Sequence, residues 1–509
     1  MSYIRYIIIL LLLISRLTCF SQSNRIKGTV FLDSNKNGIR DQNEKGIKDI
    51  CVSNGWDVVR TNNDGSWALN AEGKSDLFLI KPADYAVPVN RDMIPQYYFN
   101  FRENSSAFNR SIDFPLVRAA EKSKFSAIFF GDPQARGVRE VNYINHDVVE
   151  ECLGTDALFG VSLGDIVADD PNLFAEISQG IGRIGIPWYN NFGNHDRDRD
   201  NKSGDKWDST FNRFFGPGTY AFEYGKVAFI SLNNIFFKPD GKYICHLTSD
   251  QLSFVKNYLS TVPANKLIVM MMHEPIVRCD NRERLFELIQ DRKYTFSISG
   301  HAHVMMNLFV SGEQGWKGKS PHHHLVNATV CGSWWCGTFD EVGIPHATMN
   351  DGAPNGYSVI TFDNTNYSVR FKAARRPDSY QMNIYLPDEI KENEVESAKI
   401  QVNVFAGSER SVVEMRLDNR DDWIRLEKVD AVDPECLRMH QQSPWLQQVI
   451  DGKLMEDVFG NAMDAPATSR HMWQTFMPKG IAAGPHTITV RTKDMFGQSW
   501  QAGRIFRIR

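Results

Sequence analysis

The 509-residue sequence has no strong excess of either charge, no internal repeat and no low-complexity linker. Its net charge of −4 gives no general electrostatic reason to bind a polyanion. No basic stripe interleaved with aromatic residues is visible, so we expect no nucleic-acid partner, and a nuclease is the weakest enzymatic hypothesis. The content of 42% hydrophobic and 23% charged residues is typical of a globular protein. Its length favours about three domains.

Long hydrophobic runs are also missing, except for one short segment at the N-terminus. A basic residue precedes an apolar run from Tyr6 to Ile14, which is too short to span a bilayer comfortably. Ser21 offers a small residue for cleavage, so we interpret residues 1–22 as a signal peptide. We expect an exported protein, periplasmic or extracellular, with no stable membrane span. A lipid anchor on Cys19 is the competing hypothesis, but the three residues before it make a poor lipoprotein motif.

Cysteine is sparse, and its spacing matches no zinc motif. Of eight cysteines, the loss of Cys19 leaves seven, so at least one thiol stays unpaired. Export would place these residues in an oxidising compartment. We expect most of them to be small buried apolar residues, with Cys331–Cys336 as the candidate disulfide.

The pattern of apolar residues divides the chain into three regions. Residues 25–117 show short alternating strands and turns, which predicts a small β-sandwich. Residues 122–335 alternate apolar strands with helices, one of which opens with Asp170 as cap and Pro171 in the first turn; this is typical of an α/β domain. Residues 336–509 return to strands and turns, which predicts a β-rich domain without a helix of comparable length.

Polar residues follow five of the apolar strands in the central region. The strands KFSAIFF, ALFGVSL, WYNNF, KLIVMMM and YTFSIS precede GDPQ, GD, GNHD, HE and GHAH. Residues just past the carboxyl ends of strands in an open α/β sheet converge on one crevice, so we expect one shared site. Its candidate residues are Asp132, Gln134, Asp165, Asn194, His195, Asp196, His273, His301 and His303.

The side chains in this set indicate a metal centre. Carboxylates, carboxamides and imidazoles without a thiolate suit Zn, Mn or Fe, and they disfavour copper and iron–sulfur centres. Seven such ligands are too many for one tetrahedral ion. Two ions about 3.5–4 Å apart, bridged by a carboxylate, would use all seven. The glycines before the ligands are expected to permit the sharp turns that aim each side chain into the crevice.

In this order, the motifs D-x-[HQ], GD, GNHD, H and GHxH resemble the five blocks of calcineurin-like metallophosphoesterases. The resemblance implies a central β-sandwich flanked by helices (αββα) and hydrolysis of a phosphate mono- or diester by a metal-bridging hydroxide. The metal ligands that it implies are Asp132, Gln134 and His303 for the first ion, Asn194, His273 and His301 for the second, and Asp165 as the bridge.

The same resemblance implies two residues outside the metal ligands. His195 would stand beside the phosphate, where it stabilises charge or protonates the leaving group, and Asp196 would orient it. Gln134 departs from the common pattern, because most members have histidine there. A glutamine oxygen can still ligate a hard metal, so Gln134 is the position where metal preference would change.

The outer regions are similar to those of a bacterial exported branch of this superfamily. The segment CGSWWCGTFDEVGIP and the closing domain carry the likeness at the C-terminal side. Residues expected to line the substrate entrance are Trp334, Trp335, Asp351 and Asn355, with a packed seam between domains as the alternative. We exclude His322, His323 and His324 as ligands, because a strand points only alternate side chains to one face.

A second metal motif lies near the N-terminus and fits the calcium-loop pattern D-x-[DN]-x-[DN]-G-x5-E. Its candidate ligands are Asp33, Asn35, Asn37, Ile39 through its carbonyl, Asp41 and Glu44. The flanks look like strands, so the motif resembles the calcium loops of secreted β-sandwich repeats. A solvated turn without an ion is the alternative.

The leading functional hypothesis is therefore a two-metal hydrolase that acts on a small-molecule or glycan-linked phosphoester. The rival hypothesis is an exported carbohydrate- or surface-binding protein with an inactive phosphoesterase-like domain. The two β-rich flanking regions support the rival, and the five ordered motifs favour the enzyme.

Overall fold

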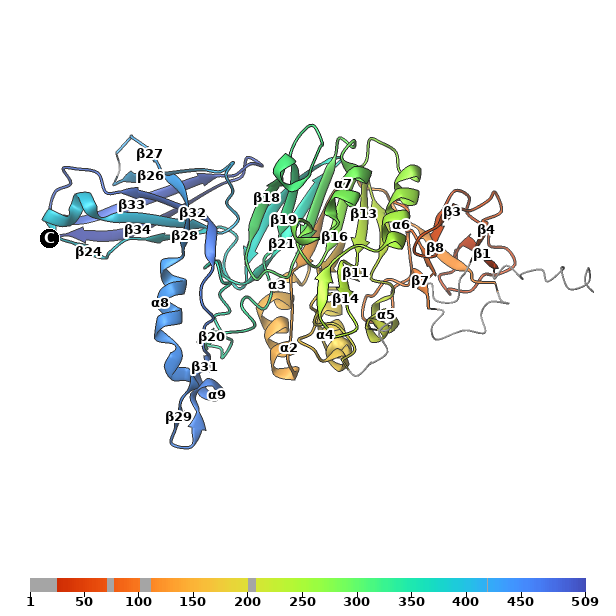
Figure 1. Ribbon diagram of the computed structural model, residues 1–509, viewed down its shortest axis with the longest axis horizontal. Helices are drawn as coiled ribbons and strands as arrows, with labels where there is room; N and C mark the ends of the chain where they lie inside the picture. The colour runs from red at the N-terminus through yellow and green to blue at the C-terminus, as the bar shows by residue number, and fades with distance from the viewer. Residues whose placement is uncertain (1–24, 71–76, 101–110, 200–206, 419) are drawn as a thin grey trace, which may run out of the picture.

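The computed structural model describes residues 25–70, 77–100, 111–199, 207–418 and 420–509. The predicted signal peptide, residues 1–22, lies outside this part of the chain. None of the helices in the described ranges is long and apolar enough to cross a membrane. The molecule is elongated, with an N-terminal β-domain at one end, a C-terminal β-domain at the other and an α/β unit between them (Figure 1).

The N-terminal unit contains two four-stranded sheets, in the orders β4-β1-β8-β6 and β3-β2-β5-β7. Apolar side chains such as Val30, Val52 and Leu116 are fully buried in it, which agrees with the predicted small β-domain. Its strands are β1 Arg25–Leu32, β2 Cys51–Ser53, β3 Val58–Arg60, β4 Ser66–Asn70, β5 Leu77–Leu79, β6 Tyr85–Ala86, β7 Tyr98–Phe99 and β8 Phe114–Arg118.

The central unit is built on two sheets, in the orders β11-β10-β9-β21-β22 and β12-β13-β16-β17-β19-β18. They pack face to face, and the rings of Phe159 and Phe229 lie 5.1 Å apart between them. The strands are β9 Lys124–Phe130, β10 Phe159–Ser162, β11 Trp188–Asn190, β12 Tyr220–Tyr224, β13 Val227–Leu232, β16 Leu267–Met272, β17 Thr295–Ser299, β18 Met306–Val310, β19 His322–Val326, β21 Gly356–Asp363 and β22 Asn366–Ala373.

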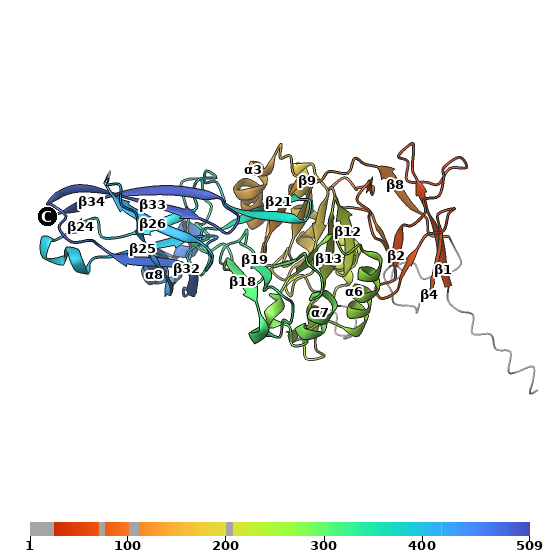
Figure 2. The same ribbon diagram turned by 90° about the horizontal axis from the view of Figure 1, so that it is seen from above.

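Helices cover the outer faces of both sheets, as Figure 2 shows for α3 on one side and α6 and α7 on the other. Every residue of β13 and β16 is buried, as expected for parallel strands covered on both faces. This is the predicted αββα arrangement. The helices are α2 Val138–Ile144, α3 Glu150–Cys152, α4 Phe174–Ile181, α5 Ser209–Phe215, α6 Ser249–Thr261 and α7 Arg282–Ile289. The predicted cap is present: the Asp170 side chain accepts the Asn172 N–H just before α4.

The central sheet continues past residue 335, where the sequence placed the domain boundary. β21 pairs antiparallel with β9, with Ile360 opposite Ala127, and β22 pairs with β21. The α/β unit therefore includes residues up to Ala373. An irregular stretch separates these strands from β19, which hid their membership of the sheet.

The C-terminal unit is β-rich, as predicted, with sheets in the orders β23-β25-β32-β28 and β24-β34-β33-β26-β27. Buried residues such as Val402, Met415 and Ile488 form its core. The strands are β23 Met382–Tyr385, β24 Glu389–Ile390, β25 Lys399–Val404, β26 Val412–Leu417, β27 Ile424–Arg425, β28 Glu427–Val432, β32 Thr468–Phe476, β33 Gly484–Lys493 and β34 Ser499–Ile508.

The prediction that this region has no comparable helix is wrong. Helix α8, Pro434–Gln442, has nine residues, one more than α4. The Asp433 side chain accepts the N–H groups of Glu435 and Cys436, and Pro434 occupies the first turn. The same Asp-Pro pair marks the helix at Asp170, so the signal was present but lay among strand-like segments.

Helix α8 begins an arm, residues 433–463, that projects from the C-terminal sheets (Figure 1). The arm also holds the hairpin β29 Val449–Ile450 and β30 Lys453–Leu454, the helix α9 Met455–Phe459, and β31 Gly460–Asn461. β31 pairs with β20, Gly337–Thr338, which ties the arm to the α/β unit.

The cysteines pair differently from the prediction. A disulfide joins Cys245, at the end of β15 Tyr243–Cys245, to Cys279, whereas Cys331 and Cys336 are free and buried. The hairpin of β14 Ile235–Phe237 and β15 is thereby fastened beside the loop that follows β16. Cys336 packs instead with Cys436 and Met463 of the arm.

Candidate metal centre

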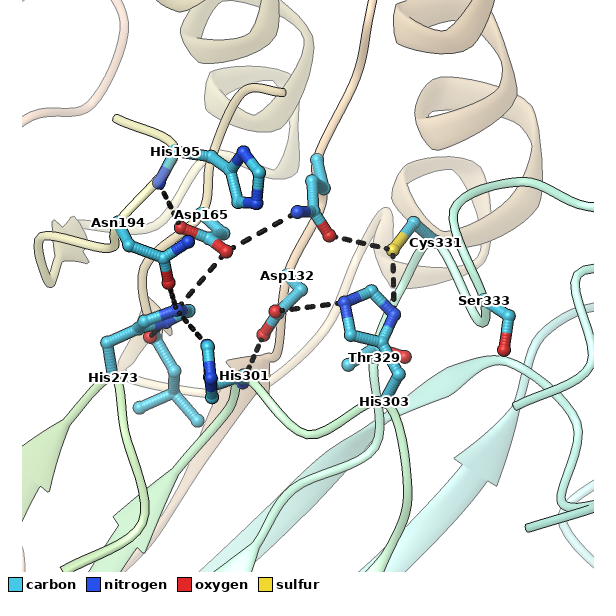
Figure 3. Close-up of polar contacts among 12 residues, drawn as sticks. Asp132, Asp165, Asn194, His195, His273, His301, His303, Thr329, Cys331 and Ser333 are labelled. Carbon is cyan, nitrogen blue, oxygen red and sulfur yellow. Dashed lines mark hydrogen bonds and ion pairs between the residues drawn. The ribbon is translucent and has the colours of Figure 1, made fainter. Parts of the chain in front are cut away.

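The loops after β9, β10, β11, β16 and β17 bring the predicted ligands together (Figure 3). Four ligand atoms gather around one point. Nε2 of His273 lies 3.0 Å from Oδ1 of Asn194, 3.1 Å from Nδ1 of His301 and 3.2 Å from Oδ2 of Asp165. Nδ1 of His273 is 2.9 Å from the Leu163 carbonyl oxygen, which orients the ring so that Nε2 faces the cluster.

A second group of atoms lies on the other side of Asp165. Oδ2 of Asp132 is 3.5 Å from Nε2 of His303, and Nε2 of Gln134 is 3.4 Å from Oδ2 of Asp165. The His303 ring is fixed from behind, where Nδ1 contacts the Gly332 carbonyl oxygen. Asp165 therefore lies between the two groups, in contact with both.

The residues fit a divalent cation. Oδ2 of Asp132 is buried and has no hydrogen-bond partner, although Oδ1 accepts the His301 N–H. Asp132, Asp165 and His273 are at most 1% exposed. Carboxylates are costly to bury without a compensating positive charge, which a metal ion would supply. The cluster of Asp165, His273 and His301 holds one ligand atom each within 4.8 Å of one another.

The pKa values in the cluster are set by burial and by the pairing of Asp165 with His273. Burial raises the pKa of Asp132, although His273 and His303 oppose this. Burial would also raise the pKa of Asp165, but the charge of His273 lowers it well below its usual range. Burial opposes protonation of His273, yet the Asp165 carboxylate raises the pKa of His273 to about 10. This pairing favours a proton on His273, which a metal ion bound at Nε2 would have to displace.

Five of the seven predicted metal ligands have a left-handed backbone. The φ angles are 37° at Asp132, 44° at Gln134, 48° at Asp165, 71° at His301 and 51° at His303. This conformation costs a non-glycine residue on the order of 1 kcal/mol and persists only where the surrounding structure holds it. Such strain is concentrated at functional sites in proteins.

The glycines before the predicted ligands leave room for carboxylates in addition to permitting turns. A Cβ on Gly193 would lie 2.2 Å from Oδ1 of Asp165, and a Cβ on Gly300 would lie 2.3 Å from Oδ1 of Asp132. Of these glycines only Gly164 has positive φ, 93°. Turns do follow Gly193 and Gly300, because the Asp196 N–H donates to the Gly193 carbonyl and the Ala302 N–H donates to the Gly300 carbonyl. These two glycines also leave room for the carboxylates, which the sequence did not predict.

The partner of His195 differs from the prediction. Nδ1 of His195 lies 3.0 Å from Oδ1 of Asp169, and Asp169 also pairs with Arg199. Asp196 is fully buried, and its carboxylate accepts three N–H groups, those of Ile166, Val167 and Gly193. Asp196 holds two ligand loops together, whereas Asp169 is the carboxylate beside the catalytic candidate. The backbone N–H of His195 donates to Oδ1 of Asp165 at 2.8 Å.

Asp169 and Cys331 contact site residues without having been predicted. The sulfur of Cys331 lies near both Gln134 and His303, which come from different loops. Cys331 is not spaced from another cysteine or histidine as zinc ligands are, so the sequence offers no sign that it contacts the site. For Asp169, the one available signal is its place in the loop after GD, on the same edge of the sheet.

The four expected entrance residues occupy different environments. Trp334 is 37% exposed, and its ring stacks on His303, whereas Trp335 is fully buried. Asp351 is buried, accepts the Met305 N–H and contacts His471 of the C-terminal unit at 2.8 Å. Asn355 is buried as well and donates to Asp147 and the Val330 carbonyl. Of these four residues, Trp334 is the exposed one beside the predicted metal ligands, and Asp351 belongs to the seam between the units.

The histidine run of β19 is part of the core, in agreement with its exclusion as a ligand set. His322 and His324 both contact the Ser297 hydroxyl, whereas His323 faces the other way, towards Tyr367 and Asn307. Burial lowers the pKa of His322 and of His323 to about 3, so both are neutral.

The predicted calcium loop is folded around its first and last carboxylates. Asp33 accepts the N–H groups of Asn37 and Gly38. Glu44 accepts those of Ser34 and Asp41. Asn35 and Asn37 both donate to Oδ2 of Asp41, and the Ile39 side chain is 68% exposed. The six candidate residues thus form one closed loop.

Three family models match the chain in order. They are the N terminal of Calcineurin-like phosphoesterase over residues 34–119, Calcineurin-like phosphoesterase over 125–305, and the C terminal of Calcineurin-like phosphoesterase over 324–500. No curated protein matches in sequence.

Two solved structures show a remote likeness. Purple acid phosphatase PPD1 from yellow lupin (Lupinus luteus) seeds is 12% identical, with 65% of this chain and 69% of that chain covered and a TM-score of 0.36. The spore cortex lytic enzyme SleM of Clostridium perfringens is 13% identical, with 77% and 100% covered and a TM-score of 0.18. The three matched models and the αββα unit with its clustered ligands show that the chain belongs to the calcineurin-like phosphoesterase superfamily.

Proposed function

We propose that this chain hydrolyses phosphate mono- or diesters with two metal ions, Zn, Mn or Fe, held on either side of Asp165. The observation that carries the proposal is the place of the Asp165 carboxylate. Its Oδ2 lies 3.2 Å from Nε2 of His273 and 3.4 Å from Nε2 of Gln134, between two separate sets of ligands. A shared carboxylate of this kind is what a pair of ions about 3.5–4 Å apart requires.

The ligand roles follow from the two groups. The first ion would be held by Asp132, Gln134 and His303, the second by Asn194, His273 and His301. When bound, such ions lower the pKa of water and neutralise charge on phosphoryl oxygens. Gln134 would ligate through Oε1 after a half turn of its amide, which brings Oε1 towards Asp165 and Nε2 towards the sulfur of Cys331.

His195 is the residue best placed to act on the substrate itself. Its side chain is 30% exposed, whereas those of His273 and His303 are at most 3% exposed. The Asp169 carboxylate lies beside Nδ1 and holds the ring, and from this position the imidazole could donate a hydrogen bond to a phosphoryl oxygen or a proton to the departing alkoxide. Asp196 would support this step indirectly, through the loops that it joins.

Export of the mature chain remains part of the proposal. The disulfide between Cys245 and Cys279 supports it, because disulfides persist in oxidising compartments such as the periplasm or the extracellular space. Cleavage of residues 1–22 is tested by sequencing the N-terminus of protein recovered from the outer compartment of a bacterial host.

The substitution Asp165→Asn tests the two-metal assignment. Purified parent protein should contain about two transition-metal equivalents and hydrolyse p-nitrophenyl phosphate or bis-p-nitrophenyl phosphate. Asp165→Asn should lower kcat by more than about 100-fold and reduce the metal content, because the bridge loses its charge.

Asp170→Asn is a matched control for this experiment. It makes the same chemical change at a nearby helix cap, and asparagine caps helices as well as aspartate does. Normal turnover by Asp165→Asn would refute the bridge. A metal-loaded parent protein that binds glycans but hydrolyses none of a panel of phosphoesters would favour the rival binding function.

A further inference from the structure

Two consecutive tryptophans next to the metal centre have a left-handed backbone. The φ angles of Trp334 and Trp335 are 53° and 54°. Bulky side chains rarely adopt this conformation, and a pair of them is held only where surrounding contacts enforce it. The segment that contains them follows Cys331, which contacts two of the proposed ligands.

Trp335 is the anchor of the pair. It is fully buried, its Nε1 donates to the Pro133 carbonyl at 3.2 Å, and its ring lies 5.6 Å from the ring of Tyr143 in α2. Its backbone N–H donates to the Cys331 carbonyl at 2.8 Å. The segment is thereby fastened to the loop after β9, which carries Asp132.

A second contact fixes the peptide of Trp334. Nη2 of Arg136 donates to the Trp334 carbonyl at 2.9 Å, and Arg136 itself is held by Glu140 in an ion pair of 2.7 Å. With Trp335 turned inward and this carbonyl tied down, the Trp334 side chain is directed outward.

The Trp334 ring stacks on a proposed metal ligand and is still partly exposed. The ring lies 4.2 Å from the His303 imidazole at an interplanar angle of 30°, so one face covers a proposed metal ligand. The residue is nevertheless 37% exposed. A second aromatic residue, Tyr243, stands edge-on to His301 with ring centroids 6.3 Å apart. The two proposed ions thus lie beside one stacked and one perpendicular aromatic ring.

We propose that the exposed face of Trp334 binds the organic group of the substrate, so that the site prefers phosphoesters of a ring with a flat apolar face. Aromatic rings and sugar rings share this feature, and small alkyl groups lack it. This proposal rests on the phosphoesterase function proposed above and concerns the choice of leaving group. Trp334 is then a specificity residue, held beside His303 by the anchored Trp335 and by the fixed carbonyl of its own peptide.

Binding of two phosphonates separates this proposal from hydrolysis. Phenylphosphonate and methylphosphonate share the phosphoryl oxygens, and neither has an ester bond to cleave. We expect Mn-loaded parent protein to bind the phenyl compound more tightly in calorimetry. In Trp334→Ala the Kd of phenylphosphonate should rise about tenfold, and that of methylphosphonate less than about twofold. Trp334→Phe should restore most of the difference.

Three controls make the result specific. Trp445→Ala removes a tryptophan of similar exposure, 39%, from the arm and should leave both Kd values unchanged. Trp334→Gly removes the ring without the cost of the left-handed backbone, so it should fold at least as stably as Trp334→Ala and lose the same phenyl preference. Metal content by elemental analysis should stay at the parent level in all variants.

Other outcomes would overturn the proposal. Equal weakening of both phosphonates in Trp334→Ala would assign Trp334 to support of His303 alone. A phenyl preference that survives Trp334→Ala and is lost in Tyr243→Ala would assign the platform to Tyr243. If the parent protein bound neither phosphonate, the phosphoesterase proposal itself would fail. With active enzyme, kcat/KM for phenyl phosphate and glucose 1-phosphate then distinguishes aromatic from sugar leaving groups.

Discussion

The sulfur of Cys331 lies 3.6 Å from Oε1 of Gln134, the proposed ligand that departs from the usual histidine. The same sulfur is 3.8 Å from Nδ1 of His303, so one side chain backs two proposed ligands of the first ion. Burial raises the pKa of the Cys331 thiol well above its usual value, and the group therefore stays neutral. A neutral thiol can accept from the amide of Gln134 once that amide has turned its oxygen to a metal.

Removal of this thiol should weaken the first ion. Cys331→Ala takes away the partner of Gln134 and opens space behind His303, and changes around metal ligands typically cost 10–100-fold in affinity. We expect metal content after dialysis to fall towards one equivalent, with a change in Kd of about tenfold for one of two sites in calorimetry. Cys152→Ala, at another buried cysteine, is the control. Retention of two equivalents at parent affinity would show that Cys331 only fills space.

The contact between Asp169 and His195 predicts a dependence on the leaving group. Asp169→Asn removes the carboxylate that lies 3.0 Å from Nδ1 of His195 and holds the ring, and proton donation matters most when the departing alkoxide is a poor leaving group. We expect kcat to fall by about tenfold or more for an alkyl phosphate and much less for p-nitrophenyl phosphate. The measurement is the slope of log kcat against leaving-group pKa. An unchanged slope would remove His195 from the proton-transfer step.

Calcium should stabilise the N-terminal unit if the loop from Asp33 to Glu44 binds it. An ion that binds only the folded protein raises the melting temperature. We expect ~1 mM calcium to raise the Tm of the parent, and Glu44→Gln to abolish the increase because the last ligand loses its charge. Magnesium at the same concentration is the control for ionic strength. Identical melting curves with calcium and with chelator would leave the motif as a hydrogen-bonded turn.

Lys81 predicts how stability changes with pH. It is 3% exposed, and its Nζ donates to the carbonyls of Glu223 and Pro82. Burial lowers the pKa of Lys81 to about 7, although Glu223 opposes this, whereas an unfolded lysine titrates near ~10.4. Between these values the unfolded chain binds more protons, so the free energy of unfolding should rise with pH, by up to about 1.4 kcal/mol per unit.

Below pH 7 both states carry the proton, and this contribution to stability is lost. Lys81→Met should remove the rise between pH 7 and 9 in denaturant titrations. Lys48→Met, at a side chain that is 58% exposed, should keep it. A pH slope that persists in Lys81→Met would mean that another group is responsible.

The convergence of the proposed ligands was predictable because each loop that carries them follows an apolar strand, and strand ends in such a sheet share one edge. Asp132, Asp165 and His273 needed no more than this rule. The roles of Asp169 and Asp196 were not predictable from spacing, because which carboxylate turns to His195 depends on backbone angles within two loops. Asp196, one residue from His195, points back to the N–H groups of Ile166 and Val167.

The features that the sequence could not predict depend on contacts between residues far apart in the chain. Cys331 meets Gln134 across 197 residues of sequence, and no local pattern records such a contact. The strand β21 reads as an ordinary alternating strand, and only its pairing with β9 assigns it to the α/β unit. Helix α8 was predictable from the Asp433-Pro434 pair at its start, but the sequences on both sides have the pattern of strands.

The left-handed backbone at five proposed ligand residues lowers the stability of the folded protein. At Asp132, Gln134, Asp165, His301 and His303, glycine would fit the left-handed backbone with less strain than the residue present. A copy of this chain that no longer needed to bind metal would gain stability with each such replacement, so substitutions to glycine would tend to accumulate. The presence of all five strained residues is what the proposed metal site predicts, and their replacement by glycine would mark a descendant sequence in which that site is no longer used.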